Sequence, residues 1–150
     1  MPPDRWRVFL DTNVLIAGMA SHTGASAAIL DLGESEEILV VLSRQVLIEA
    51  DRTFSEKFPH LTGRFRIWIE NLSPLLADDP TPSSVHEAAR VIHLNDAPIL
   101  AAAKQEQVEY LVTLNTRHFL TSKARSYFIR PIVTPAEFLL AFRHFWEQSA

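Results

Sequence analysis

Three short apolar runs recur along the chain, and helical patterns lie between them. The runs are WRVFL (6–10), ILVVL (38–42) and YLVTL (110–114). Short runs that are apolar on both faces are typical of strands buried inside a parallel sheet. The resulting order of strand, helices, strand, helices, strand predicts an α/β domain with a parallel sheet. We expect a last strand over residues 128–133.

The segments between these runs have the patterns of helices. A cap at Ser43 predicts a helix through about Phe58, and Pro135 stands in the tolerated first turn of a terminal helix. Residues 77–83 (ADDPTPS) are the only linker-like stretch, and they are too short to separate domains. We therefore expect one domain over residues 1–150. The other expected helices cover residues 14–19, 25–33, 61–72, 84–93 and 98–107.

Composition excludes several classes of protein. The chain has no cysteine, which excludes a disulfide scaffold, a thiolate zinc site and a cysteine nucleophile. A net charge of −4 argues against a protein that coats DNA non-specifically. The first apolar run breaks at Asp11, and no apolar stretch reaches the roughly 18 residues that span a bilayer. We expect a cytoplasmic protein with no membrane anchor.

Familiar zinc and phosphate motifs are also missing from the sequence. No GxxxxGK[ST] loop, GxGxxG loop or GxSxG elbow occurs. The six histidines show none of the spacings HxH, HxxxH or HExxH, so a zinc site built from histidines is not expected. These histidines are His22, His60, His86, His93, His118 and His144.

Acidic residues instead suggest a site at one edge of the sheet. Asp11 follows the first strand directly, and Glu49 and Asp96 line or begin helices that should pack near the same edge. Carboxylates gathered without basic partners raise one another's pKa, and a shared hard cation removes that repulsion. Mg²⁺ or Mn²⁺ takes oxygen ligands, polarises a phosphoryl oxygen and activates water.

Each of these residues also has a purely structural interpretation. Asp11 and Asp96 both stand where a helix cap is expected, and Glu49 has the character of a solvated helix position. Asn13 is typical of an Asx turn. Thr113 fits the interior of a strand, where β-branched residues are common. Spacing alone leaves these alternatives open.

Four segments taken in order resemble the signature segments of the PIN domain nucleases, a family that includes the VapC-type toxins of toxin–antitoxin pairs. They are VFLDTNVLIAG (8–18), LSRQVLIEADR (42–52), LNDAPILAAAKQ (94–105) and LVTLNTRHF (111–119), and VTPAEFLLAF (133–142) matches the tail of such proteins. The resemblance implies a three-layer fold with a five-stranded parallel sheet flanked by helices. It also implies cleavage of single-stranded RNA that depends on Mg²⁺ or Mn²⁺, and a cognate antitoxin as partner.

The same resemblance gives roles to particular residues. Asp11 and Asp96 would bind the metal, and Glu49 would bind it directly or through water. Thr12 or Asn13 would hold Asp11, and Thr113 would support the carboxylates. The family pattern has a fourth acid two residues after this threonine, where the chain has Asn115. The neutral amide keeps one oxygen ligand and loses a charge, which weakens binding of a second metal.

Other side chains concern substrate and assembly. Arg117, just after the strand at 110–114, is a reasonable contact for a substrate phosphate, whereas Lys104 is better explained as a solvated side chain. Four aromatic residues at helical spacing near the C-terminus predict packing in the core or in a homodimer rather than stacking on bases. They are Phe138, Phe142, Phe145 and Trp146.

Two rival functions remain. Asn115 favours a catalytically weakened PIN-fold module that binds RNA or serves in assembly, whereas the three intact acids favour the nuclease. A haloacid-dehalogenase-like phosphatase also opens on a strand followed by Asp. That chemistry needs a second acid two residues later, and position 13 is Asn.

Overall fold

The computed structural model describes residues 5–149, and a parallel sheet of five strands lies at its centre. The strand order is β3-β2-β1-β4-β5, which confirms the α/β fold with a parallel sheet. Val8, Phe9 and Leu10 of the central strand are fully buried, as their apolar run predicted. The strands are β1 (Arg7–Leu10), β2 (Leu39–Leu42), β3 (Leu75–Leu76), β4 (Tyr110–Val112) and β5 (Ile132–Val133).

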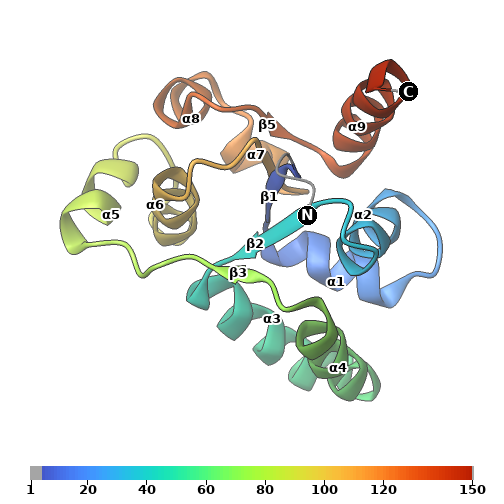
Figure 1. Ribbon diagram of the computed structural model, residues 1–150. Coiled ribbons are helices and arrows are strands. Elements are labelled where there is room, and N and C mark those ends of the chain that lie inside the picture. The colour runs from blue at the N-terminus through green and yellow to red at the C-terminus, as the bar shows by residue number, and fades with distance from the viewer. Residues whose placement is uncertain (1–4, 150) are drawn as a thin grey trace.

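Helices cover the sheet on both sides. Figure 1 shows α5 and α6 on one side and α2 and α9 on the other. In the described part of the chain no single helix is long and apolar enough to cross a membrane, and only α1 with α2, bent by 95° at their junction, reaches that length and apolarity. The helices are α1 (Thr12–Ala20), α2 (Ala25–Glu34), α3 (Arg44–Lys57), the 3₁₀ turn η1 (Pro59–Leu61), α4 (Thr62–Leu72), α5 (Pro82–Ala88), α6 (Ala97–Gln105), α7 (Thr116–Phe119), α8 (Ser122–Phe128) and α9 (Pro135–Ser149).

The strand order reverses between β1 and β4. From β1 the chain adds β2 and then β3 on one side, and it returns to place β4 and β5 on the other. Leu10 is paired with Val112, so the two strands end level with each other. The backbone N–H of Asp11 continues this ladder by donating to the carbonyl of Val112 at 3.0 Å. Ligand crevices of such sheets lie at the carboxyl ends of strands where the order reverses.

Two expected elements are shorter than their patterns predicted. The helix expected over 84–93 ends at Ala88, and turns occupy most of the stretch before α6. The strand expected over 128–133 is confined to Ile132–Val133, because Phe128 ends α8 and is itself buried. Ile129 then takes a positive φ of 73°, which breaks the extended run.

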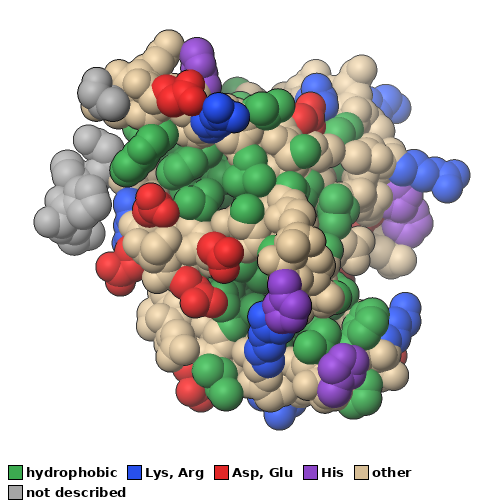
Figure 2. All heavy atoms as spheres, turned by 90° about the vertical axis from the view of Figure 1, so that its right-hand side faces the viewer, with side chains coloured by type: hydrophobic (Ala, Val, Ile, Leu, Met, Phe, Trp, Pro, Cys, Tyr) green, Lys and Arg blue, Asp and Glu red, His purple; other side chains and the backbone are tan. Residues whose placement is uncertain are grey.

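The C-terminal helix shows where its aromatic residues pack. Phe138 is fully buried, with ring centroids 6.0 Å from Trp6 and 5.3 Å from Tyr110, so it belongs to the core. Phe145 and Trp146 are 40% and 58% exposed. Figure 2 looks at this side of the molecule and shows hydrophobic side chains at the surface with Asp and Glu around them. A homodimer through these residues stays a prediction.

Candidate active site

A cavity of about 460 Å³ lies at the carboxyl ends of β1 and β4. Asp11, Glu49, Asp96 and Asn115 all line it, although they come from widely separated parts of the sequence. Thr113 is buried and Arg117 does not line the cavity. The lining residues are Asp11, Thr12, Asn13, Gln45, Glu49, Arg52, Thr53, Asn95, Asp96 and Asn115.

Asp11 is held between β1 and the segment that follows β4. Its side chain is only 5% exposed. The backbone N–H of Thr12 donates to Oδ1 at 2.7 Å, and the hydroxyl of Thr113 donates to Oδ2 at 2.8 Å. The backbone N–H of Asn115 donates to the same hydroxyl oxygen at 2.9 Å, which leaves the hydroxyl proton for Asp11. Asp11 therefore both caps α1 and faces the cavity.

Burial dominates the electrostatics of this carboxyl group. Desolvation raises the pKa of Asp11 to about 6, against the lowering effect of the hydrogen bonds from Thr113 and Thr12, while Asp96 and Glu49 raise it further. The sequence predicted mutual repulsion as the cause, and the structure gives burial the larger part. A carboxyl group that titrates near neutral pH in a cleft is a frequent mark of a functional site.

Glu49 reaches the cavity from α3, which begins after Ser43 accepts a hydrogen bond from the N–H of Val46. The hydroxyl of Thr12 donates to Glu49 Oε1 at 3.0 Å, and Nε2 of Gln45 donates to Oε2 at 2.9 Å. The Glu49 residue is partly buried. These bonds distinguish Glu49 from a freely solvated helix residue, and they tie it to the residue next to Asp11.

Asp96 precedes α6 but its side chain does not cap that helix. Oδ2 instead lies 2.7 Å from Nδ1 of His118 in α7, and the Asp96 side chain is 18% exposed. Asn115 caps α7, with its Oδ1 accepting from the N–H of His118 at 3.4 Å. Sequence reasoning missed His118, whose only signal was its place three residues after Asn115.

The site carboxylates are held by hydroxyl, amide and imidazole donors. Among residues 5–149 no Lys or Arg forms an ion pair with Asp11, Glu49 or Asp96. Arg52, which the sequence did not single out, brings one cation to the lining. Lys104 lies elsewhere, with Nζ 3.6 Å from the ring centroid of Tyr127.

The donor set suits a hard divalent cation. Nowhere in the part of the chain that the structure describes do three His, Asp or Glu side chains already stand together as a metal-binding group. Mg²⁺ and Mn²⁺ nevertheless need few protein ligands, because they keep several waters and prefer carboxylate oxygens. Asp11 and Asp96, with Glu49 and Asn115 in the lining of the same cavity, provide that chemistry.

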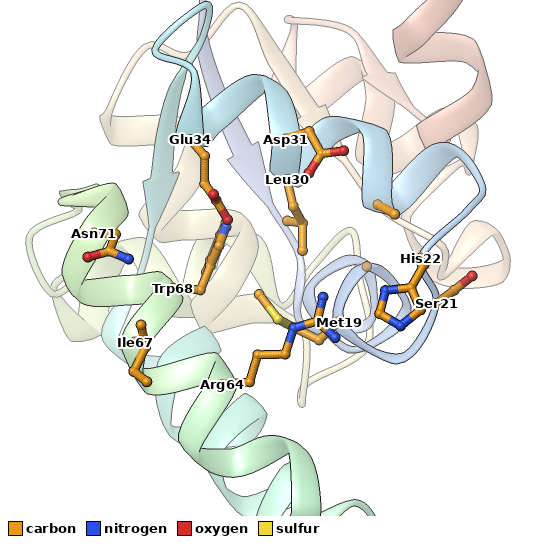
Figure 3. Close-up of a pocket in the computed structure, with 12 residues that line it drawn as sticks. Met19, Ser21, His22, Leu30, Asp31, Glu34, Arg64, Ile67, Trp68 and Asn71 are labelled. Atoms are coloured by element: carbon orange, nitrogen blue, oxygen red, sulfur yellow. The ribbon is translucent and has the colours of Figure 1, made fainter.

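A second cavity, of about 210 Å³, lies between α1, α2 and α4 (Figure 3). Its lining includes Met19, Leu30 and Trp68 together with Asp31, Glu34 and Arg64. Asp11, Glu49 and Asp96 do not line this second cavity. The chemistry predicted from the sequence therefore concerns the first cavity.

Comparison with known families assigns most of this chain to one domain family. A model of the PIN domain matches residues 7–117. This range includes the four candidate residues that line the cavity, namely Asp11, Glu49, Asp96 and Asn115. The chain belongs to the PIN domain family. The match confirms the resemblance seen in the four segments, and the sheet edge that carries Asp11 is part of the PIN domain.

Solved structures share the PIN fold with this chain at low sequence identity. VapBC2 from Rickettsia felis, bound to a DNA fragment from its promoter, has 19% identity and a TM-score of 0.64, covering 85% of this chain and 98% of that one. FitAcB from Neisseria gonorrhoeae has 20% identity and a TM-score of 0.61, covering 85% and 97%. PAE2754 from Pyrobaculum aerophilum has 16% identity and a TM-score of 0.61, covering 93% of this chain and 96% of that one. No curated protein matches the sequence.

Proposed function

We propose that this PIN domain protein is an endoribonuclease that cleaves phosphodiester bonds of single-stranded RNA with Mg²⁺ or Mn²⁺. The observation that carries the proposal is the gathering of Asp11, Glu49 and Asp96 around one cavity with no Lys or Arg paired to them among the described residues. The pKa of the most buried of these acids is raised to about 6. A bound cation would offset the repulsion between the carboxylates and stabilise their charged forms.

The chain's own residues would bind and orient the reacting groups. Asp11 and Asp96 would hold the cation, and Glu49 would hold it directly or accept a proton from a water molecule in the cavity. When bound, the metal supplies charge for a phosphoryl oxygen and lowers the pKa of water. Thr113 and Thr12 fix the two oxygens of Asp11, so this carboxylate is already oriented before any ligand arrives.

Arg52 is the side chain best placed to bind the RNA backbone. It is exposed and lines the cavity one turn of α3 beyond Glu49. A guanidinium beside an acidic cavity is suited to a phosphate on the flank of the scissile bond. Arg117 stays a prediction as a second phosphate contact on the rim.

The biological role that we propose is that of the toxin in a toxin–antitoxin pair. The shared fold with VapBC2 and FitAcB supports it, as do the four signature segments. Expression of the chain alone should then arrest growth, and co-expression with the product of the neighbouring gene should restore it. Growth that continues with the protein stably produced would contradict this role. Assembly as a homodimer and a location in the cytoplasm stay predictions.

Asn115 supports the second candidate function, a weakened module that binds RNA without cutting it. The residue lines the cavity where the family pattern has an acid, and its side chain caps α7. Asp and Asn are about equally good helix caps, so the neutral residue is not demanded by the fold. Asn115 makes the cavity less negative than an acid at this position would.

A cleavage assay separates the two functions. Purified protein is incubated with a labelled single-stranded RNA and with DNA of the same sequence, in Mg²⁺, in Mn²⁺ and in EDTA. The proposal predicts cleavage of RNA that EDTA abolishes. Binding of RNA without cleavage in either metal would favour the weakened module, and cleavage that persists in EDTA would contradict metal dependence.

A further inference from the structure

We propose that His118 is a positioning residue that orients the Asp96 carboxylate towards the cavity, with the ring of His93 stacked behind it. The inference rests on the proposed function, since it concerns the same site. The role proposed for His118 is to hold a metal ligand in place, and His118 itself binds neither the metal nor the substrate. The observations that support it come from two short segments, the turn before α6 and helix α7.

The first observation is the way in which Asp96 departs from the usual role of its position. An Asp at the start of a helix normally accepts hydrogen bonds from backbone N–H groups of the first turn. Here Pro98 removes one of those donors, and the side chain of Asp96 makes no capping bond. The carboxylate is turned to His118 instead, at 2.7 Å from Nδ1.

The direction of that hydrogen bond follows from the chemistry of the two groups. A carboxylate only accepts, so Nδ1 of His118 carries the proton and donates it. Nδ2 of Asn115 also lies near Nδ1, but at 3.4 Å, and the shorter contact decides which group Nδ1 faces. Oδ2 faces His118, and Oδ1 of Asp96 makes no hydrogen bond within residues 5–149, so Oδ1 is the oxygen more open to a ligand in the cavity.

The second observation is a stacked pair of imidazoles. The rings of His93 and His118 are 5.2 Å apart at their centroids and 4° from parallel. Nδ1 of His93 accepts the backbone N–H of Asn95 at 3.1 Å, which ties this ring to the turn that carries Asp96. The turn and α7 are therefore joined twice, once by the stack and once by the hydrogen bond to Asp96.

These contacts resemble the outer partners of metal ligands in general. A group that binds one oxygen of a ligating carboxylate fixes the orientation of the other, and its loss typically weakens metal binding about 10- to 100-fold. Thr113 has the same relation to Asp11. His118 thus orients Asp96 in the same way as the hydroxyl of Thr113 orients Asp11.

Two substitutions of His118 separate hydrogen bonding from packing. His118→Asn places an amide nitrogen near the position of Nδ1 and removes the ring, whereas His118→Phe keeps a ring to stack on His93 and removes the donor. His86→Phe, on the exposed face of α5, is the matched control. Mn²⁺ affinity is measured by titration calorimetry, and the melting temperature of each metal-free variant is recorded.

We expect His118→Phe to weaken Mn²⁺ binding at least about tenfold and His118→Asn to stay within about threefold of the unsubstituted protein. Equal affinity in His118→Phe and the unsubstituted protein would overturn the proposal. So would a loss in His118→Asn as large as that in His118→Phe, because a nitrogen donor near the position of Nδ1 would then make no difference to metal binding. If the unsubstituted protein binds no Mn²⁺ at all, the proposed function fails rather than the assignment of His118.

A measurement on the unsubstituted protein keeps the proposal testable if His118→Phe does not fold. Nitrogen-15 spectra of the histidine rings should show the proton of His118 on Nδ1, and Mg²⁺ should shift the resonances of His118 and leave those of His86 in place. A proton found on Nε2 only, with Nδ1 bare, would overturn the proposal.

Discussion

Two carboxylates join β1 to β4, one at each end of the same pair of strands, and they are held in opposite ways. At the amino end, Oε2 of Glu109 accepts the backbone N–H of Arg7 at 2.7 Å in an exposed setting. At the carboxyl end, Asp11 is buried and accepts from the hydroxyl of Thr113. The first carboxylate remains in water, and the second is desolvated with other acids near it.

The difference indicates which of the two contacts serves the fold. An exposed carboxylate that accepts one backbone N–H closes the ladder at little cost. A buried carboxylate whose pKa is raised to about 6 destabilises the metal-free protein at neutral pH. Such a carboxylate is typical of a site where it binds a ligand or takes part in catalysis. Matched substitutions at the two ends therefore test the account.

The largest expected contrast is in catalysis. Asp11→Asn should lower the rate of RNA cleavage at least about 100-fold, because metal chemistry at a phosphoryl group is worth several kcal/mol. Glu109→Gln keeps an acceptor for the N–H of Arg7 and should stay within twofold. The readout is the initial rate on one labelled RNA. Similar losses in both variants would mean that the two ends do not differ in function.

The next contrast is in stability as a function of pH. The folded state binds the Asp11 proton more tightly than the unfolded state, so the stabilising contribution is present below pH 3.8 and is lost as pH rises through 6. The shift of roughly two units corresponds to about 3 kcal/mol. Asp11→Asn does not titrate, so in EDTA its free energy of unfolding relative to the unsubstituted protein should rise from pH 4 to pH 7.

Denaturant unfolding at several pH values measures this difference. A constant gap between the two proteins across that range would contradict the raised pKa. A loss of stability in metal-free Asp11→Ala at neutral pH would indicate that the carboxylate serves mainly as the cap of α1, because alanine removes the cap, for which the expected loss is about 0.5–2 kcal/mol.

Adding charge to the carboxyl end should sharpen the contrast further. Asn115→Asp places another carboxylate at the cavity, and opposite charges a few ångströms apart gain roughly 1–4 kcal/mol at intermediate dielectric. We expect Mn²⁺ to bind about tenfold more tightly and RNA to be cut at lower metal concentration, with a modest loss of stability without metal. No change in affinity or activity would place residue 115 outside the site.

The smallest effect concerns the substrate. Arg52→Gln should raise KM for RNA by about fivefold and leave kcat nearly unchanged, as expected for one exposed phosphate contact worth about 1 kcal/mol. Arg90→Gln, an exposed arginine outside every cavity described above, is the control. A fall in kcat with KM unchanged would mean that Arg52 acts on the reacting phosphate itself.

The central strands could be predicted because their signal is local. Residues 6–10, 38–42 and 110–114 are apolar in nearly every position, and a strand buried on both faces needs that pattern. The edge strand β3 and the short helices α7 and α8 were missed, since two to seven residues carry no periodicity of their own. Phe128 resembled the start of a strand because burial alone does not distinguish a strand from the end of a helix.

The candidate site could be predicted only in part. Asp11 and Asn115 follow strands, so their meeting at the edge of the sheet follows from parallel topology. His118, Gln45 and Arg52 were missed because their roles depend on which neighbour each faces. The contact of His118 with Asp96 joins residues 22 positions apart, and helix α7 that creates it has no signal in the sequence beyond its cap.

Titration of Mn²⁺ into the metal-free protein shows whether the carboxyl ends of β1 and β4 form the metal site. Calorimetry is carried out on the unsubstituted protein, Asp11→Asn, Asp96→Asn and Glu109→Gln. We expect each Asp variant to bind Mn²⁺ at least about tenfold more weakly and Glu109→Gln to bind it as the unsubstituted protein does. Unchanged affinity in both Asp variants would contradict a metal site at these strand ends.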